Sequence, residues 1–177
     1  LKEDIFQPRF IISYLLYFTL TLLIGLSMTI SGPGVSPDSV WYISSAENLL
    51  KGKGLALGMT TSLDISDLTP YSAWPPLYPL SIAFLSSLKL DSTSSSRFCS
   101  ILPFAFLMIP LFMIGVLTSS PKVAHLSCVI CMFLTPLVSI STYAWPESLY
   151  ILLSSLAILS LLLFTQRTGT RSGFACL

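Results

Sequence analysis

The sequence contains very few charged residues. Only 10% of its 177 residues are Asp, Glu, Lys or Arg, while 53% are hydrophobic; an ordinary soluble domain carries about 25% charged residues. A chain this poor in charge cannot cover a water-facing surface, which excludes a soluble domain and indicates an integral membrane protein. The net charge of +1 leaves no basic surface for nucleic acid, so nucleic acid is excluded as a partner.

Histidine and cysteine are scarce as well. The single histidine, His125, leaves little for a histidine-based metal site. Cys128 and Cys131 form a CxxC pair, but they lie in an apolar stretch without a second pair, so we interpret them as packing residues. No internal repeat divides the chain, and we expect one membrane domain over residues 1–177.

Long uncharged stretches predict four transmembrane helices. The first, residues 10–30, has 21 residues and would extend about 31 Å, the thickness of a bilayer core. A cleaved signal peptide is the alternative, but the apolar run exceeds the usual ~15 residues and no A-x-A site follows. The other predicted spans are residues 98–118, 123–141 and 149–164. The predicted fold class is an all-α, multi-pass membrane protein, and the tail after Phe164 predicts no further element.

A polar segment, residues 31–97, separates the first two spans and is expected to form an external loop. Within it, Ser36-Pro37-Asp38 provides a hydroxyl N-cap, a proline at the first helical position and an acid in the first turn. This pattern predicts a helix over residues 37–50 that lies on the membrane surface. Its expected apolar face consists of Val40, Ile43, Ala46 and Leu50, while Asp38, Tyr42 and Ser45 share another face.

A second external helix is predicted over residues 76–88. Its apolar part, Leu77 to Leu88, would extend about 18 Å against a core of ~30 Å, so we expect it to lie at the interface or to re-enter rather than to cross. This arrangement puts five basic residues on the cytoplasmic side with the N-terminus, in agreement with the positive-inside rule: Lys2, Arg9, Lys122, Arg167 and Arg171.

Three charged residues are predicted to meet at the outer membrane face. Glu147 would cost about 2.5–3.5 kcal/mol at the centre of a span, so the chain is expected to turn there, on the same side as Asp38 and Arg97. A carboxylate can accept a proton from an acceptor hydroxyl, and a guanidinium can hold a departing phosphate. Transfer of a group from a lipid-linked phosphate needs such a set of residues.

Several motifs of the external loop resemble one family. The stretches Asp38-Ser-Val-Trp-Tyr42, Ala46-Glu-Asn-Leu-Leu-Lys-Gly-Lys-Gly-Leu55 and Trp74-Pro-Pro-Leu-Tyr-Pro79 are similar to the first external loop of the C-type membrane glycosyltransferases. These enzymes use polyprenyl-phosphate-linked sugars and include protein O-mannosyltransferases and aminoarabinose transferases. The resemblance covers residues 10–164, which is the opening part of the family's multi-span architecture.

The resemblance implies specific roles for several residues. It implies that Asp38 is the catalytic carboxylate and that Arg97 contacts substrate. It also implies that substrate is contacted by the Pro-Pro turn, Pro75-Pro76, and by Tyr42 and Trp74 in the neighbouring motifs. Glu147 matches an acid that the family carries in a Ser-Glu-Pro context, although here the order is Pro146-Glu147-Ser148.

The same resemblance implies an activity and a location. It implies transfer of one sugar, usually with inversion, from an undecaprenyl- or dolichyl-phosphate donor to a lipid, glycan or protein. The bound metal varies among relatives, so this chain could use a divalent metal, but no particular metal can be assigned. The expected location is a multi-pass position in a membrane, the bacterial inner membrane rather than the endoplasmic reticulum.

Structural explanations exist for the same residues. Asp38 can serve the helix dipole alone, Arg97 can be an interfacial anchor, and the tryptophans can belong to an aromatic belt. Asp64 and Asp67 are interpreted as solvated loop residues. The alternative functions are a non-catalytic membrane scaffold, with this polar loop contacting a partner, or a truncated remnant without activity.

Overall fold

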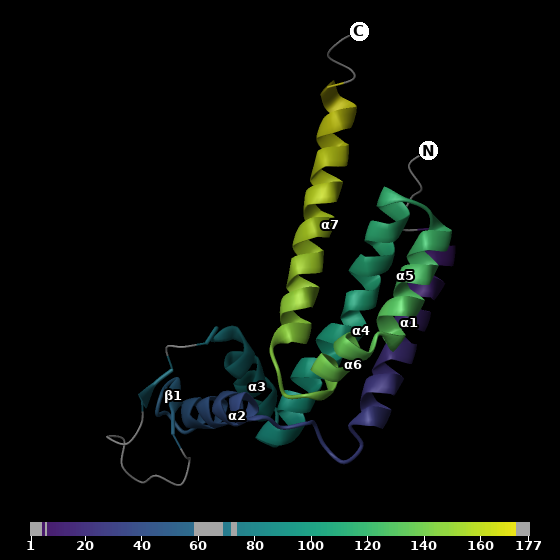
Figure 1. Ribbon diagram of the computed structural model, residues 1–177. Helices are drawn as coiled ribbons and strands as arrows, with labels where there is room; N and C mark the ends of the chain where they lie inside the picture. The colour runs from purple at the N-terminus through teal and green to yellow at the C-terminus, as the bar shows by residue number, and fades with distance from the viewer. Residues whose placement is uncertain (1–4, 6, 59–68, 72–73, 173–177) are drawn as a thin grey trace.

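The computed structural model describes residues 5, 7–58, 69–71 and 74–172, and of residues 167–172 it describes the backbone alone. Asp64 and Asp67 therefore lie outside the described residues. The elements follow one another as α1 (Pro8–Met28), α2 (Pro37–Leu50), β1 (Ala56–Leu57), β2 (Thr69–Pro70), α3 (Leu77–Ser87), α4 (Ser92–Thr118), α5 (Pro121–Phe133), α6 (Thr135–Thr142) and α7 (Glu147–Ser172) (Figure 1).

Three helices are long and apolar enough to cross a membrane, namely α1, α4 and α7. Helices α5 and α6 make a fourth candidate if they are counted as one span, although they are bent by 57°. Helix α3 has only 11 residues and is too short to cross. Three to four apolar candidate spans fit an all-α membrane protein.

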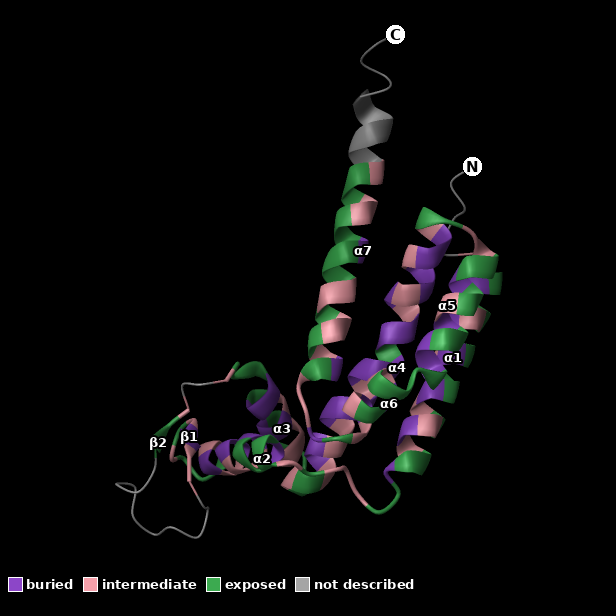
Figure 2. Ribbon diagram, viewed as in Figure 1, coloured by how far each residue is buried: buried purple, intermediate pink, exposed green. Residues whose placement is uncertain are grey.

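Helix α4 forms the centre of the bundle and contacts α1, α5 and α7. It is buried along most of its length, whereas α7 is largely exposed (Figure 2). Gly115 lets α4 approach α5 closely, because a Cβ there would lie 2.7 Å from the Cα of Ala124. Cys128 and Cys131 are free, buried thiols in this core, as expected for packing residues.

Two connections and the α2–α3 pair lie at one end of the bundle. Residues 29–36 follow α1 and residues 143–146 precede α7 there, and α2 runs across the direction of the bundle helices with α3 packed against it (Figure 1). This region is called the loop end below. The start of α1, the α4–α5 turn and the end of α7 lie at the opposite end.

The polar connection after α2 contains a short β-ladder that the sequence did not predict. Ala56 pairs with Pro70 and Leu57 with Thr69 in antiparallel register. The amide of Tyr71 also donates to the carbonyl of Leu55 at 3.1 Å. These bonds bring Tyr71 and Trp74 back beside α2.

The second predicted span begins earlier than expected. Helix α4 starts at Ser92 rather than at residue 98, because the carboxylate of Asp91 accepts the amide of Ser94 at 2.8 Å and caps the helix. Arg97 therefore lies inside the second turn of α4 instead of ahead of the helix.

The third and fourth predicted spans also differ from expectation. Pro136 lacks the N–H that the carbonyl of Met132 would need, and its ring would clash with that carbonyl. The expected single segment is therefore two helices, α5 and α6, with Leu134 extended between them. Helix α7 starts at Glu147 and continues beyond Phe164 to Ser172, since no proline follows to end it.

The predicted apolar face of α2 is wrong in part. Val40 and Leu50 are exposed, by 51% and 47%, whereas Ser39, Ser45 and Asn48 are fully buried. Packing against α3 and β1 selects the face that carries Tyr42, and the small polar residues of that face fit the close contact. Tertiary contacts here override the hydrophobic pattern.

Candidate functional site

The start of α2 is built as predicted. Ser36 is its N-cap and Pro37 its first residue, and the side chain of Ser36 accepts the amide of Ser39 while the side chain of Ser39 accepts the amide of Ser36. Asp38 lies in the first turn with its side chain exposed, where the helix dipole favours a negative charge.

The connection that leads to Glu147 is attached to the connection that leads to Asp38. Gly34 donates its amide to Thr142 O at 2.8 Å, and Ala144 donates its amide to Gly34 O at 3.0 Å, which forms a parallel bridge. The starts of α2 and α7 are thus neighbours at the loop end, although Asp38 and Glu147 are far apart in sequence.

Tyr42 follows Asp38 by one turn of α2. Its side chain is 5% exposed, and burial raises the pKa of its hydroxyl, which the charges of Glu147 and Asp38 raise further. Both carboxylates therefore act on one hydroxyl. Tyr42 stays neutral and can donate a hydrogen bond.

Three further aromatic residues surround Tyr42. Its ring centroid lies 5.2 Å from that of Tyr78 and 6.5 Å from those of Tyr71 and Trp74. Burial also raises the pKa of Tyr71 and of Tyr78. The Tyr71 hydroxyl is buried and has no hydrogen-bond partner among the described residues. This aromatic cluster presents neutral hydroxyls and flat rings beside the acids, and flat rings of this kind can pack on a ligand.

Arg97 does not stand free at this site. Its Nε donates to Thr29 Oγ1 at 2.8 Å, and Nη2 donates to the carbonyl of Leu26, also at 2.8 Å. A positive charge is thereby placed at the C-terminus of α1, where the helix dipole is negative. The guanidinium belongs to the loop end, as expected, but two of its N–H groups serve α1 rather than a ligand.

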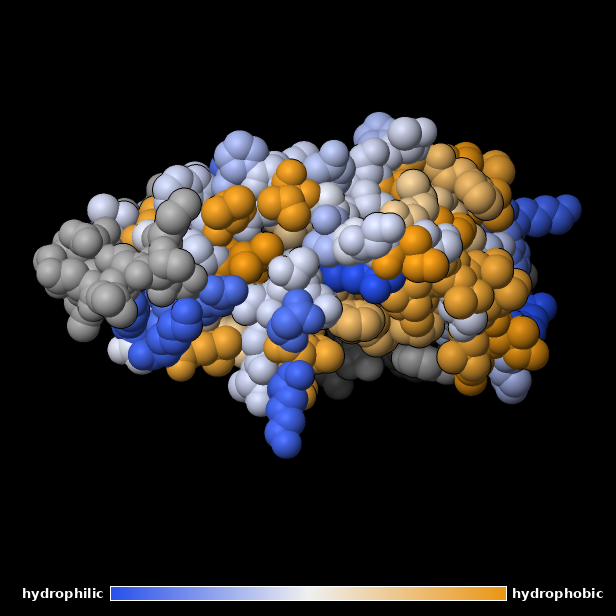
Figure 3. Space-filling model, turned by 90° about the horizontal axis from the view of Figure 1, so that it is seen from below, coloured by the Kyte–Doolittle hydropathy of each residue, from blue (hydrophilic) through white to orange (hydrophobic). Residues whose placement is uncertain are grey.

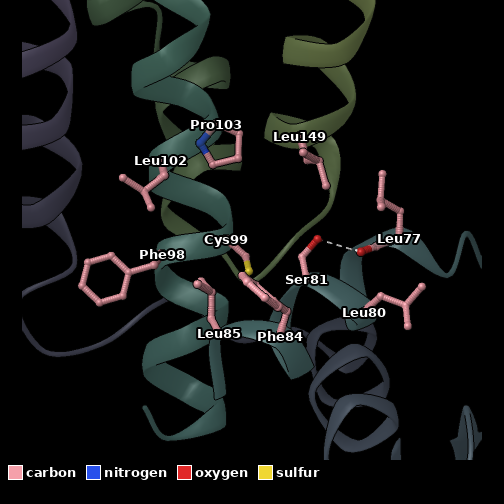
Figure 4. A pocket seen from close by; sticks show the side chains of 10 residues that line it. All are labelled: Leu77, Leu80, Ser81, Phe84, Leu85, Phe98, Cys99, Leu102, Pro103 and Leu149. Atoms are coloured by element: carbon pink, nitrogen blue, oxygen red, sulfur yellow. Dashed lines mark hydrogen bonds between the residues drawn. The ribbon is translucent and has the colours of Figure 1, made fainter. Parts of the chain in front are cut away.

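Two apolar grooves lie beside the start of α7 and share Leu77 and Leu149. The larger, about 390 Å³, lies between α3, α4 and the start of α7 and is lined by Leu77, Leu80, Ser81, Phe84, Leu85, Phe98, Cys99, Leu102, Pro103 and Leu149 (Figure 4). The second, about 270 Å³, is lined by Pro75, Leu77, Tyr78, Pro146, Glu147, Leu149, Tyr150 and Leu153. It places Glu147 and Pro75 on one groove, while Pro76 is exposed at the start of α3.

The hydropathy of the surface at the loop end varies across the molecule. Seen from below, this surface mixes hydrophilic and hydrophobic residues, and the hydrophobic residues are densest on the side of the bundle (Figure 3). Among the described residues, no group of three or more His, Cys, Asp or Glu side chains could hold a metal ion. The loop end is an amphipathic site that includes the carboxylates of Asp38 and Glu147.

Tyr71 was not predicted from the sequence, and Trp145 was predicted only as an aromatic-belt residue or a substrate contact, not as a partner of Ser36. Tyr71 lies three positions before Trp74, and Trp145 lies two positions before Glu147. Nearness to these candidates was the available signal, but the hydrogen bonds and ring contacts that place them depend on the fold. Comparison with family models, curated proteins and solved structures gives no match.

Proposed function

We propose that this chain is the N-terminal part of a membrane glycosyltransferase that transfers a sugar from a polyprenyl-phosphate donor. The observation that carries the proposal is the backbone bridge that makes the starts of α2 and α7, which carry Asp38 and Glu147, neighbours beside an aromatic cluster and two apolar grooves. A polar reaction centre next to a lipid-compatible groove fits a substrate whose phosphate lies at the membrane surface and whose chain is hydrocarbon.

In the proposed reaction, an acceptor hydroxyl attacks the anomeric carbon of the donor sugar. Asp38 takes the hydroxyl proton, the new glycosidic bond forms, and the bond between the anomeric carbon and the phosphate oxygen breaks. The bonding electrons leave with the polyprenyl phosphate. The N–H groups of Arg97 that do not bind α1 would hold the departing phosphate, and Glu147 would orient the sugar.

The proposed membrane position has the loop end outside and the N-terminus in the cytoplasm. Arg9 at the start of α1 and Lys122 at the start of α5 belong to the opposite end. Cytoplasmic placement of these basic residues follows the positive-inside rule. In this position α5 and α6 together form the third of four spans, α2 and α3 lie at the outer surface, and a bacterial inner membrane is the proposed location.

One observation favours a second candidate function. The bonds of Arg97 to α1 explain that residue without any substrate, which agrees with a non-catalytic membrane scaffold. The scaffold predicts no chemical turnover of a lipid-linked sugar.

A transfer assay separates the two functions. The full-length protein is reconstituted in vesicles with undecaprenyl or dolichyl phosphate carrying radiolabelled mannose or aminoarabinose, together with membrane lipids and glycans as acceptors. We expect release of polyprenyl phosphate and movement of label to an acceptor. Retention of label on every donor by correctly folded protein would support the scaffold instead.

A further inference from the structure

Two hydrogen-bonded connections lead directly into the two acids. The bridge between Gly34 and the Tyr143 segment joins them through backbone groups. Asp38 follows Gly34 by four residues, and Glu147 follows Tyr143 by four residues. A shift of one connection against the other would therefore shift one carboxylate against the other.

A side-chain bond adds to this bridge. Trp145 Nε1 donates to Ser36 Oγ at 2.7 Å, and Ser36 is the N-cap of α2. Trp145 and Ser36 each lie two residues before an acid. The bond thus joins the N-terminus of α2 to the segment that starts α7.

The hydroxyl of Ser36 is fully used in this arrangement. It accepts from Trp145 and from the amide of Ser39, at 3.3 Å, so its own hydrogen is left for Ser39 Oγ at 3.1 Å. A hydroxyl offers one donor and two acceptor positions. Loss of the Trp145 donor would leave one acceptor position open at the cap of α2.

Trp145 also contacts Tyr143 and Ser100. Its ring stacks on Tyr143 with centroids 4.7 Å apart, and its carbonyl accepts from Ser100 Oγ at 3.2 Å. Ser100 Oγ lies 2.7 Å from the hydroxyl of Tyr78, so the backbone of Trp145 is anchored on α4 and, through Ser100, on α3. A belt tryptophan directs its N–H to the membrane–water boundary, whereas this one donates to a protein hydroxyl.

We infer that Trp145 is a positioning residue that fixes Asp38 relative to Glu147 through its hydrogen bond to Ser36. The expected effect of Trp145 on sugar transfer rests on the proposed function. Its expected effect on the distance between α2 and α7 does not. A displacement of about 1 Å in a catalytic group can lower a rate by about 10²-fold. Trp145 therefore acts on the rate without touching the reacting atoms.

The test is Trp145→Phe in the full-length protein, which keeps an aromatic ring and removes the donor. We expect kcat to fall by about ten- to a hundredfold with an unchanged KM for the donor and a thermal midpoint that falls only by the amount expected for one lost hydrogen bond. In a variant with the native cysteines replaced by alanine, spin labels at Lys51, the C-cap of α2, and at Leu156 on α7 should show a broadened distance distribution. Trp41→Phe is the matched control, since Trp41 is exposed on α2, and should change none of these quantities.

A second variant separates the bridge from the indole itself. A Cβ on Gly34 would lie 2.8 Å from Cδ1 of Tyr143, so Gly34→Ala should push the two connections apart and broaden the same distribution. Unchanged distances in both variants would overturn the inference, as would a broadened distribution with full kcat, or a loss of kcat that only follows loss of folding. If the wild-type protein transfers no sugar, the proposed function is wrong. The spin-label distances then still test whether Trp145 fixes the start of α2 relative to the start of α7.

Discussion

Replacement of Asp38 by asparagine is expected to lower the rate of the proposed sugar transfer by about 10²–10⁴-fold, the usual contribution of a positioned proton acceptor. Asparagine has the same shape as aspartate but cannot take the acceptor proton. Asp38 is exposed in the first turn of α2, so folding loses only the dipole contribution of about 0.3–1 kcal/mol. The measurement is release of polyprenyl phosphate by vesicle-reconstituted protein, with insertion checked by membrane fractionation.

Asp91→Asn is the matched control for this substitution. Asp91 caps α4 by accepting the amide of Ser94, and asparagine caps helices about as well as aspartate. The control should keep wild-type transfer. Full transfer by the Asp38→Asn protein would remove Asp38 from the mechanism.

Substitution of Arg97 by glutamine is expected to lower the stability of the fold as well as the rate of the proposed reaction. Its two hydrogen bonds to Thr29 and Leu26 join α4 to the end of α1, and bonds that involve a charged group are the stronger kind. We expect the free energy of unfolding to fall by about 2–4 kcal/mol, measured as a lower thermal midpoint in detergent. Arg97→Lys, which keeps a charge but loses the planar fork, should lie between wild type and Arg97→Gln.

Kinetics distinguish the two roles of Arg97. If its remaining N–H groups also hold the donor phosphate, Arg97→Lys raises the KM for donor at temperatures where the protein is folded. Lys51→Gln removes an exposed positive charge from the loop end and should change neither the KM for donor nor the thermal midpoint. A wild-type thermal midpoint for Arg97→Gln would contradict the structural role assigned to the two hydrogen bonds.

Local signals in the sequence predicted most of the helices. The run from Ser36 to Asp38 fixed the start of α2, and its predicted end at Leu50 is confirmed. The length of the uncharged stretches located α1, α4 and α7. The 57° bend between α5 and α6 comes from Pro136, which is itself a local signal. Such features depend on residues a few positions apart, so they can be inferred without the fold.

Contacts between distant residues could not be inferred in this way. The buried face of α2 depends on α3 and β1, and the partners of Arg97 depend on where α1 ends. Trp145 and Ser36 are 109 residues apart, and no local pattern connects them. The neighbourhood of Asp38 and Glu147 followed from the expected topology, but the bridge that holds it did not.

The most direct test of the account is the membrane side on which Asp38 and Glu147 lie. Single cysteines at positions 38, 147 and 122 are introduced into a cysteine-free variant in sealed vesicles of known orientation and treated with a membrane-impermeant maleimide. We predict that positions 38 and 147 react from the outer face, and that position 122 reacts only after the vesicles are opened. Reaction of positions 38 and 147 from opposite faces would contradict a shared site and, with it, the proposed sugar transfer.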